Sequence, residues 1–205
     1  MAVELTVPIN ETDIRALKVG DQVVLNGVIY TGRDAAHKYM MDNFIKRACP
    51  PSERAIYEEL KDGLAGSVIY HCGPVVLKGG DGQYQFVAAG PTTSIREEPY
   101  QADVIAHFGL RGVIGKGGMR EKTLAACRQY GAVYLHAIGG AATLIAESCV
   151  EVLDVFKLEF GVPEAFWKIR VVDFPCVVTM DTHGQSLHEK VLAESEAKLQ
   201  KLLAG

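Results

Sequence analysis

Short apolar segments alternate along this chain with longer stretches in which apolar residues recur at helical spacing. Strands are expected at 5–8, 22–30, 67–71, 83–89, 112–115, 132–138, 150–156 and 169–180, and helices at 33–47, 52–60, 93–108, 121–130 and 185–203. Some neighbouring strands are joined by turns too short to hold a crossover helix, as at the glycine-rich turn 79–82. The pattern therefore predicts an α/β fold with a mixed sheet flanked by helices, and not a doubly wound parallel sheet.

The length of the chain fits one domain. Its 205 residues contain no internal repeat, no low-complexity tract and no linker that would divide them. A chain of this size can bury a single well-formed core. We therefore expect one domain over residues 1–205.

Charge and hydropathy exclude two classes of partner. A net charge of −4 and a pI near 5.9 argue against nucleic-acid binding, which needs a broad basic face. No apolar stretch approaches the roughly 18 residues that cross a bilayer. The first residues lack the basic start and apolar run of a secretory signal. The expected location is the cytoplasm, without a membrane partner.

Five cysteines are spread along the chain without any C-x-x-C pair, at positions 49, 72, 127, 149 and 176. An odd, scattered set disfavours a disulfide framework and a self-contained zinc or cluster site. We expect reduced thiols, mostly packed in the interior. No metal ligand is expected in this chain, so the ligands of any metal in the chemistry would lie on another chain.

Three segments combine glycine, threonine and a cation at a strand end or a strand-to-helix turn: Thr31-Gly32-Arg33-Asp34, Gly90-Pro91-Thr92-Thr93-Ser94-Ile95-Arg96 and Gly115-Lys116-Gly117-Gly118-Met119. Glycine lets a backbone approach a ligand, and free N–H groups at a helix start favour anions. Arginine offers two donors matched to a carboxylate, and lysine a compact charge. If these loops meet, they would form a pocket for a small dicarboxylate.

Each segment also has an ordinary structural interpretation. Arg33 can be a first-turn residue paired with Asp34 or a solvent carboxylate, and the segment at 90–93 can be a turn with a helix cap. The segment at 115–118 is like a phosphate-binding loop, but it lacks the Walker spacing and the Lys-Ser/Thr ending. Only their combination points to a function.

Four motifs in order carry a family resemblance: Thr31-Gly32-Arg33-Asp34-Ala35-Ala36-His37-Lys38, His71-Cys72-Gly73-Pro74, Gly90-Pro91-Thr92-Thr93-Ser94 with Arg96, and Gly115-Lys116-Gly117-Gly118-Met119. Together they resemble the beta region of class I fumarases and L(+)-tartrate dehydratases. The similarity extends over nearly the whole chain. The blocks Gly90-Pro91-Thr92-Thr93 and Gly115-Lys116-Gly117-Gly118-Met119, at this separation, are quite specific. In some relatives this region is fused behind a cluster-binding half; here it is similar to a separate beta subunit.

The resemblance implies a swivelling β/β/α domain that closes over an alpha subunit. That partner would hold a 4Fe–4S cluster by three cysteines, with one iron open as a Lewis acid for the departing hydroxyl. The implied reaction is the reversible hydration of fumarate to (S)-malate, with L(+)-tartrate dehydratase and a non-catalytic dicarboxylate-binding module as alternatives. The implied assembly is a hetero-oligomer, or a homodimer when the chain is alone.

The resemblance also assigns residues. Arg33, Arg96 and Lys116 would bind the substrate carboxylates, and Thr93 and Gly117 would belong to the same substrate-binding set. Their charges would stabilise the negative charge that builds up as a proton leaves carbon. Thr92 would be the proton acceptor, although a threonine hydroxyl is a poor base unless a neighbouring carboxylate assists it.

Some further positions have no role assigned by the motifs. Glu97 departs from the family pattern, which often has Met after the arginine; we expect it on the solvated face of its helix, whereas an inward position could alter substrate choice. Trp167 is expected in the core or at a subunit interface, and His37 packed against Arg33. The last helix is expected to turn its apolar residues inward, namely Leu187, Val191, Leu199 and Leu202.

Overall fold

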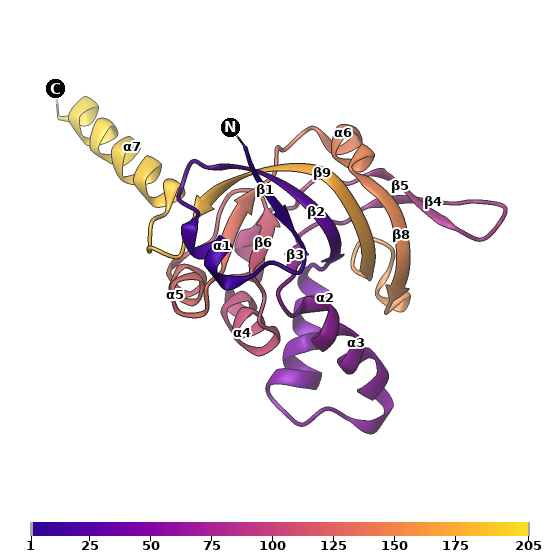
Figure 1. The fold of residues 1–205 in the computed structure, drawn as a ribbon. Coiled ribbons are helices and arrows are strands. Elements are labelled where there is room, and N and C mark those ends of the chain that lie inside the picture. The colour runs from indigo at the N-terminus through magenta and orange to yellow at the C-terminus, as the bar shows by residue number, and fades with distance from the viewer. Residues whose placement is uncertain (1, 205) are drawn as a thin grey trace.

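The computed structural model describes residues 2–204, in which strands and helices alternate (Figure 1). The strands are β1 (Val3–Thr6), β2 (Gln22–Thr31), β3 (Val68–Tyr70), β4 (Val75–Lys78), β5 (Tyr84–Ala88), β6 (Gly112–Gly115), β7 (Val133–His136), β8 (Cys149–Phe156) and β9 (Phe166–Met180). The α-helices are α1 (Glu11–Ala16), α2 (Asp34–Met40), α3 (Arg54–Leu64), α4 (Glu98–Phe108), α5 (Glu121–Tyr130), α6 (Ala142–Glu147) and α7 (Leu187–Leu203). Shorter helical turns are η1 (Met41–Ile45), η2 (Pro51–Glu53), η3 (Ser94–Glu97) and η4 (Leu158–Phe160).

Within residues 2–204 a seven-stranded mixed sheet runs in the order β1-β2-β3-β6-β7-β9-β8. The first five strands are mutually parallel, whereas β9 is antiparallel to β7, β8 and β2. Because β9 pairs with both β7 and β2, the sheet folds back on itself, and β9 arches over the parallel strands (Figure 1). The predicted mixed sheet flanked by helices is confirmed.

The central parallel strands β3, β6 and β7 are buried on both faces. Along β3, Val68 and Tyr70 pack into a core shared with β9, while Ile69 between them packs into a second core shared with α2 to α5. Side chains of a strand point alternately to the two faces of the sheet, so a continuous apolar run suits a strand covered on both sides. The layers are therefore β9 with its neighbours, the parallel strands, and the helices. Full burial of each such side chain contributes about 1.5–3 kcal/mol.

The helix predicted at 33–47 is regular only in its first part. It begins at Asp34, ends as an α-helix at Met40, and continues as a π-helix, η1. The π-helix, which has a wider turn than an α-helix, ends before Pro50. This proline cannot continue a helix and precedes η2.

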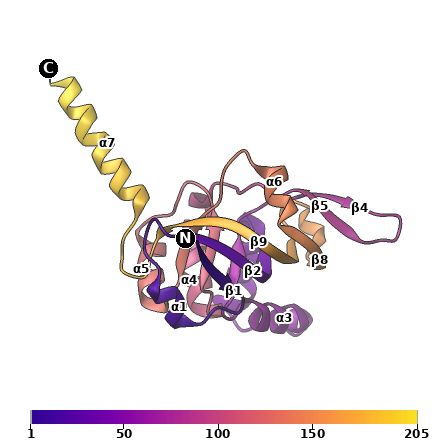
Figure 2. The ribbon, with the colours of Figure 1, turned by 45° about the horizontal axis from the view of Figure 1, so that its top comes forward.

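The prediction that strands 67–71 and 83–89 flank the turn at 79–82 is wrong. The structure inserts β4 between them, and β4 pairs with β5 as an antiparallel hairpin that projects from the body (Figure 2). β3 instead lies in the main sheet between β2 and β6. Gly73 and Pro74 lie outside any strand, and the apolar residues after them start a new strand at Val75.

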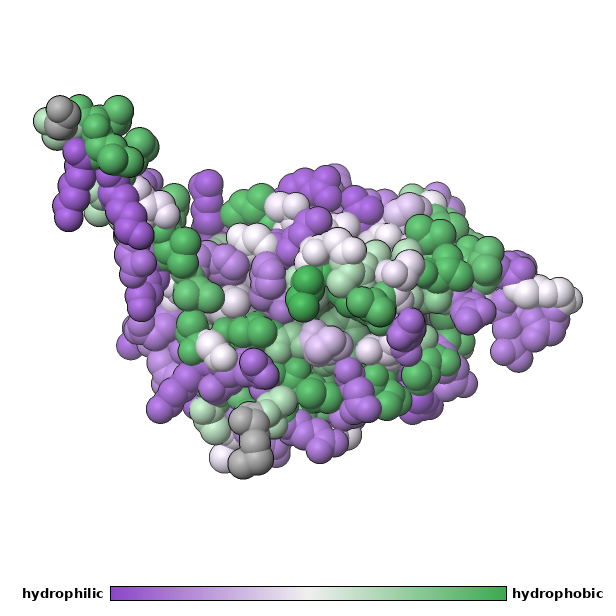
Figure 3. Space-filling view, turned by 90° about the horizontal axis from the view of Figure 1, so that it is seen from above, coloured by the Kyte–Doolittle hydropathy of each residue, from purple (hydrophilic) through white to green (hydrophobic). Residues whose placement is uncertain are grey.

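The last helix, α7, forms as predicted, with Ser186 as N-cap accepting from the backbone N–H of Glu189 at 3.3 Å. The inward position of its apolar face is wrong. None of its side chains is buried, and Leu202 is 80% exposed. α7 extends away from the body in Figures 1 and 2, and Figure 3 shows hydrophobic residues at its free end. Helical periodicity predicts an apolar face but does not provide a surface to cover it.

The helices were also compared with what a bilayer requires. Among residues 2–204, none is both long enough and apolar enough to span a membrane.

Candidate active site

One edge of the sheet gathers the ends of β2, β3, β6 and β7. These four strands are parallel neighbours, so the segments that follow them emerge at the same edge. Those segments hold Arg33, His71 and Lys116. In open α/β sheets this carboxyl edge is where ligands bind.

Backbone hydrogen bonds insert the segment with the two threonines into this edge. The N–H of Thr92 donates to the carbonyl of His71 at 2.7 Å. The carbonyl of Thr92 accepts from the N–H of Lys116 at 3.2 Å, and the N–H of Ser94 donates to the carbonyl of Lys116 at 3.1 Å. Two motifs that are more than twenty residues apart in sequence therefore form one surface.

The Thr92 hydroxyl, which is half-buried, donates to the carbonyl of His71 at 3.1 Å. This bond fixes the side-chain orientation and uses the hydroxyl proton. Oxygen lone pairs stay available to accept a hydrogen bond or a proton.

Lys116 is partly exposed and forms no ion pair with any carboxylate in residues 2–204. Thr93 is bridged to it as a parallel neighbour. A methyl group placed on Gly117 would lie 3.7 Å from Cγ2 of Thr93, and one on Gly139 would lie 3.5 Å from Cδ of Lys116. The structure thus brings Thr92, Thr93, Lys116 and Gly117 together.

The turn after Lys116 requires glycine. Gly117 and Gly118 have φ angles of 82° and 73°, in the left-handed region that side chains disfavour. A Cβ on Gly118 would also lie 2.3 Å from the ring of His188. Two successive glycines let the backbone reverse beside the exposed Lys116.

Arg33 lies at the N-terminus of α2, and its Nη2 is 3.3 Å from Oε1 of Glu164. Its ion-pair partner is therefore the partly exposed Glu164 and not Asp34. Nε of Arg33 is buried without a hydrogen-bond partner among the described residues. A Cβ on Gly73 would lie 2.4 Å from Nη1 of Arg33, so this glycine makes room for the guanidinium beside the end of β3.

Arg96 is half exposed, and its Nε lies 3.7 Å from Oδ2 of Asp34. Because Asp34 follows Arg33 directly, this contact places the two arginines on neighbouring segments. Arg96 is on the same short turn, η3, as Ser94, whose backbone is bonded to Lys116.

A buried polar cluster behind these loops was not predicted from the sequence. It consists of Ser94, Gln101, Tyr134, His37 and His71, and all five residues are fully buried. His37 is packed as expected, with Nδ1 2.9 Å from the carbonyl of Arg33. Burial lowers the pKa of both imidazoles, and that of His71 lies well below its usual value. Gln101, on the same helix face as the apolar Val104 and Ile105, was the available sequence signal.

The expected solvation of Glu97 is wrong. Its side chain is 0% exposed, because η3 turns it toward Asp34 and the interior before α4 begins. Burial is the main reason why the pKa of Glu97 is raised to about 8, and Asp34 raises it further.

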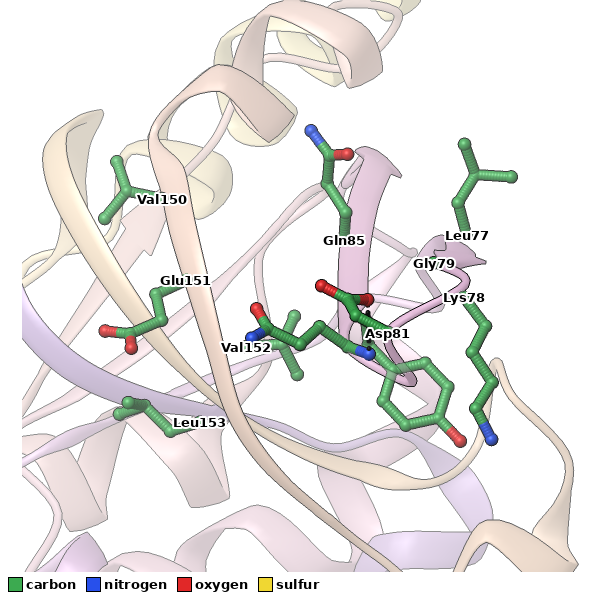
Figure 4. A pocket seen from close by; sticks show the side chains of 11 residues that line it. Leu77, Lys78, Gly79, Asp81, Gln85, Val150, Glu151, Val152 and Leu153 are labelled. Carbon is green, nitrogen blue, oxygen red and sulfur yellow. Dashed lines mark hydrogen bonds between the residues drawn. The ribbon is translucent and has the colours of Figure 1, made fainter.

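Two cavities differ in their relation to this edge. One of about 300 Å³ is lined by Thr93, Gly117 and Gly118 together with residues of α7. A larger one, about 700 Å³, lies instead between the β4–β5 hairpin and β8 (Figure 4). Figure 4 shows Asp81 and Gln85 on one side of it and Glu151 and Leu153 on the other, without the candidate cations.

The sequence was compared with known proteins. The family model described as Fumarase C-terminus matches residues 1–191. The chain belongs to this family. The resemblance found in the motifs is thus confirmed.

Relatives of this fumarase C-terminus chain differ in length. It is 54% identical over 198 residues to a protein of Geobacillus stearothermophilus provisionally named fumarate hydratase class I, covering 96% of this chain and 35% of that protein. It is 39% identical over 197 residues to a Methanocaldococcus jannaschii protein provisionally named L(+)-tartrate dehydratase subunit beta, covering 95% of each. It is 37% identical over 194 residues to the L(+)-tartrate dehydratase subunit beta of Escherichia coli K12, covering 93% and 90%. The chain therefore spans about a third of the first relative and most of the two beta subunits.

The five cysteines of this family member do not form a cluster. Cys72, Cys127, Cys149 and Cys176 are buried free thiols, and Cys49 is half-buried. Among residues 2–204, no group of three or more His, Cys, Asp or Glu side chains is arranged to hold a metal ion.

Proposed function

We propose that this chain is the beta-type part of an iron–sulfur hydro-lyase that interconverts fumarate and (S)-malate. Its share of the work is to bind the two carboxylates of the substrate at the carboxyl edge of the parallel strands. Arg33, Arg96 and Lys116 supply the positive charge for this, and Thr93 and Gly117 belong to the same surface.

The observation that carries the proposal is the backbone pairing of the two most specific motifs. The backbone N–H of Lys116 donates to the carbonyl of Thr92, so a residue with a hydroxyl and a residue with a cation are backbone neighbours. Lys116 has no carboxylate partner among residues 2–204, and a substrate carboxylate would supply one. Such an arrangement is suited to an anionic small molecule.

The described residues do not fit an iron–sulfur cluster, because their thiols are dispersed and mostly buried. We therefore assign the 4Fe–4S cluster to an alpha-type partner and derive only the part of this chain. Cations on the carboxylates stabilise the negative charge that develops when a proton leaves the adjacent carbon. Thr92 Oγ1 is proposed to accept that proton while its own hydroxyl proton, which it donates to the His71 carbonyl in this structure, passes to a carboxylate of the partner.

The direct test is anaerobic co-purification with the alpha-type partner, followed by reconstitution with iron and sulfide. Fumarate, (S)-malate, tartrate and methyl-substituted analogues are then assayed for turnover. Conversion of (S)-malate to fumarate by the complex, and by neither chain alone, is the expected result.

L(+)-tartrate dehydration is the second candidate, since the two relatives that this chain covers almost completely carry that name. Preferred turnover of tartrate would assign it. Calorimetry on the lone chain separates both enzymes from a dicarboxylate-binding module: micromolar binding of malate without a partner, together with no turnover in the complex, would refute the enzymatic proposal.

A further inference from the structure

Glu97 is a fully buried carboxyl group that lacks a hydrogen-bond donor. Its side chain is 0% exposed, and neither carboxyl oxygen has a donor among the described residues. The η3 turn packs against α2, and the Asp34 carboxyl lies close enough to help raise the pKa of Glu97; Oδ1 of Asp34 is also buried without a donor. Two facing carboxylates would repel each other at low local dielectric, whereas a proton between them forms a hydrogen bond.

The amide of Gln101 also has a buried atom without a hydrogen-bond partner. Nδ1 of His37 faces the carbonyl of Arg33, which can only accept, so Nδ1 carries the ring proton and Nε2 of the neutral ring accepts. Nε2 of His37 and Nε2 of His71 lie 3.0 and 2.8 Å from the same end of the Gln101 amide. That end must therefore be the NH₂ group, donating to both rings.

This orientation leaves the Gln101 carbonyl oxygen in need of a donor as well. Glu97 lies one helical turn before Gln101, on the neighbouring position of the helix surface. Asp34 and Gln101 therefore both present acceptor oxygens that lack a donor, and a carboxylic acid at Glu97 supplies a proton for one of them.

We propose that Glu97 is a positioning residue that stays protonated, donates its proton to the Asp34 carboxylate, and thereby holds Asp34 beside Arg96. Arg96 is 3.7 Å from the other oxygen of Asp34, so Asp34 links the buried acid to the exposed cation. The pair then carries one negative charge instead of two at a site that attracts an anion. The part that concerns substrate rests on the function proposed above.

The groups around Glu97 are consistent with a neutral acid. Asp34 of α2 and Arg96 of its own element act on its charge, and Tyr134 of β7 lies close enough to be affected by it. His37 lies beside Asp34, and His71 lies beside His37. Both histidines are kept neutral by burial, and Arg33 is already paired with Glu164. Arg96 is the remaining nearby cation, and Asp34 lies between it and the buried carboxyl.

The isolated chain tests the protonation state without any enzyme assay. Urea unfolding is measured between pH 5 and 9 for the wild-type chain and for Glu97→Gln, in which the amide keeps a donor but cannot ionise. Because the native pKa of Glu97 is about 8 and the unfolded one is near 4.5, the native state holds a proton that the unfolded state releases. Wild-type stability should therefore decline relative to Glu97→Gln as pH rises from 5 to 8.

Asp103→Asn is the matched control, since Asp103 is an exposed carboxylate on α4. Its curve should stay parallel to the wild type. Parallel curves for Glu97→Gln as well would mean that Glu97 is ionised at neutral pH, and the proposal would be overturned whatever the activity of the complex.

The complex with the alpha-type partner tests positioning. Glu97→Met should raise KM about tenfold with little change in kcat, since it removes one hydrogen bond to a charged group. Glu97→Gln should keep the wild-type KM near neutral pH and lose the decline of kcat/KM above about pH 8. An unchanged KM in Glu97→Met would overturn the positioning role. A wild-type complex without turnover would instead refute the proposed function and leave the unfolding result standing.

Discussion

At the scale of single residues, the candidate site is held mainly by backbone contacts. Lys116 and Thr92 are fixed through their own N–H and carbonyl groups, and the lysine side chain makes no ion pair with any described carboxylate. Removing a side chain should therefore leave the loops in place, so effects on activity can be separated from effects on folding.

Lys116→Ala is expected to lower kcat/KM by the equivalent of about 2–5 kcal/mol, because a substrate carboxylate would lose its charged partner. The midpoint of thermal unfolding should stay unchanged. Steady-state kinetics of the complex and a melting curve of the lone chain measure the two effects. Lys122→Ala, an exposed lysine on α5, is the control that should behave like wild type; equal kinetics for both variants would remove Lys116 from the site.

Thr92→Val is expected to lower kcat by about 10²–10⁴-fold, the range of a general acid–base contribution, and to change KM much less. Valine has nearly the shape of threonine but lacks the hydroxyl that is held by the His71 carbonyl. Thr92→Ser, which keeps the hydroxyl, should retain most of the activity. If the valine variant turns over at the wild-type rate, another group accepts the proton.

At the scale of elements, the parallel strands bring the site together, and α7 remains apart. The ends of β2, β3 and β6 share an edge because the strands are parallel neighbours, so residues from distant motifs meet there. α7 has an apolar stripe, but no described part of the chain covers it. Its apolar residues therefore contribute little to the stability of the lone chain.

Leu199→Glu combined with Leu202→Glu should leave the free energy of unfolding of the lone chain unchanged within about 0.5 kcal/mol, as for exposed positions generally. Leu64→Ala on α3, at a fully buried position, should cost about 2–5 kcal/mol. Urea unfolding measures both. A marked loss in the α7 variant would show that this helix packs against protein in solution.

At the scale of the whole molecule, buried ionisable groups set the dependence of stability on pH. Burial is the largest cause of lowered pKa values at five histidines: His37, His71, His107, His136 and His188. The fully buried His37 and His71 resist protonation in the folded state, while the unfolded chain binds protons below about pH 6.5. The free energy of unfolding should therefore fall as the pH decreases below that value.

Glu97 acts in the opposite direction over pH 4.5–8, because its folded state holds the extra proton. Below pH 6.5 the histidines change the free energy of unfolding more than Glu97 does. Above pH 6.5 the contribution of Glu97 remains and that of the histidines does not. Stability is thus expected to be highest near pH 6.5, as measured by urea midpoints from pH 5 to 8. His183→Gln, at an exposed position, should not alter the curve. A flat profile would contradict the buried neutral state of these groups.

Much of the element order could be predicted from the sequence, because local periodicity reflects which faces are buried. The strand at 112–115 and the helix at 121–130 are where they were predicted. The β4–β5 hairpin was not, since the short run Val75–Lys78 can pair with β5 or lead elsewhere until the partner strand is known. Strand pairing is a contact between distant residues, and spacing along the chain does not encode it directly.

The sequence alone determined the family, the mixed α/β character and the residue types that an anionic ligand requires, because these depend on motifs and local pattern. Only the tertiary structure decided that Lys116 pairs with Thr92, that Glu164 holds Arg33, and that α7 extends away from the body. It also decided that Glu97 is buried: a carboxyl on a helix looks solvated until the element packed over it is known. Burial and long-range pairing depend on how distant segments are packed together, and that arrangement arises only when the whole chain folds.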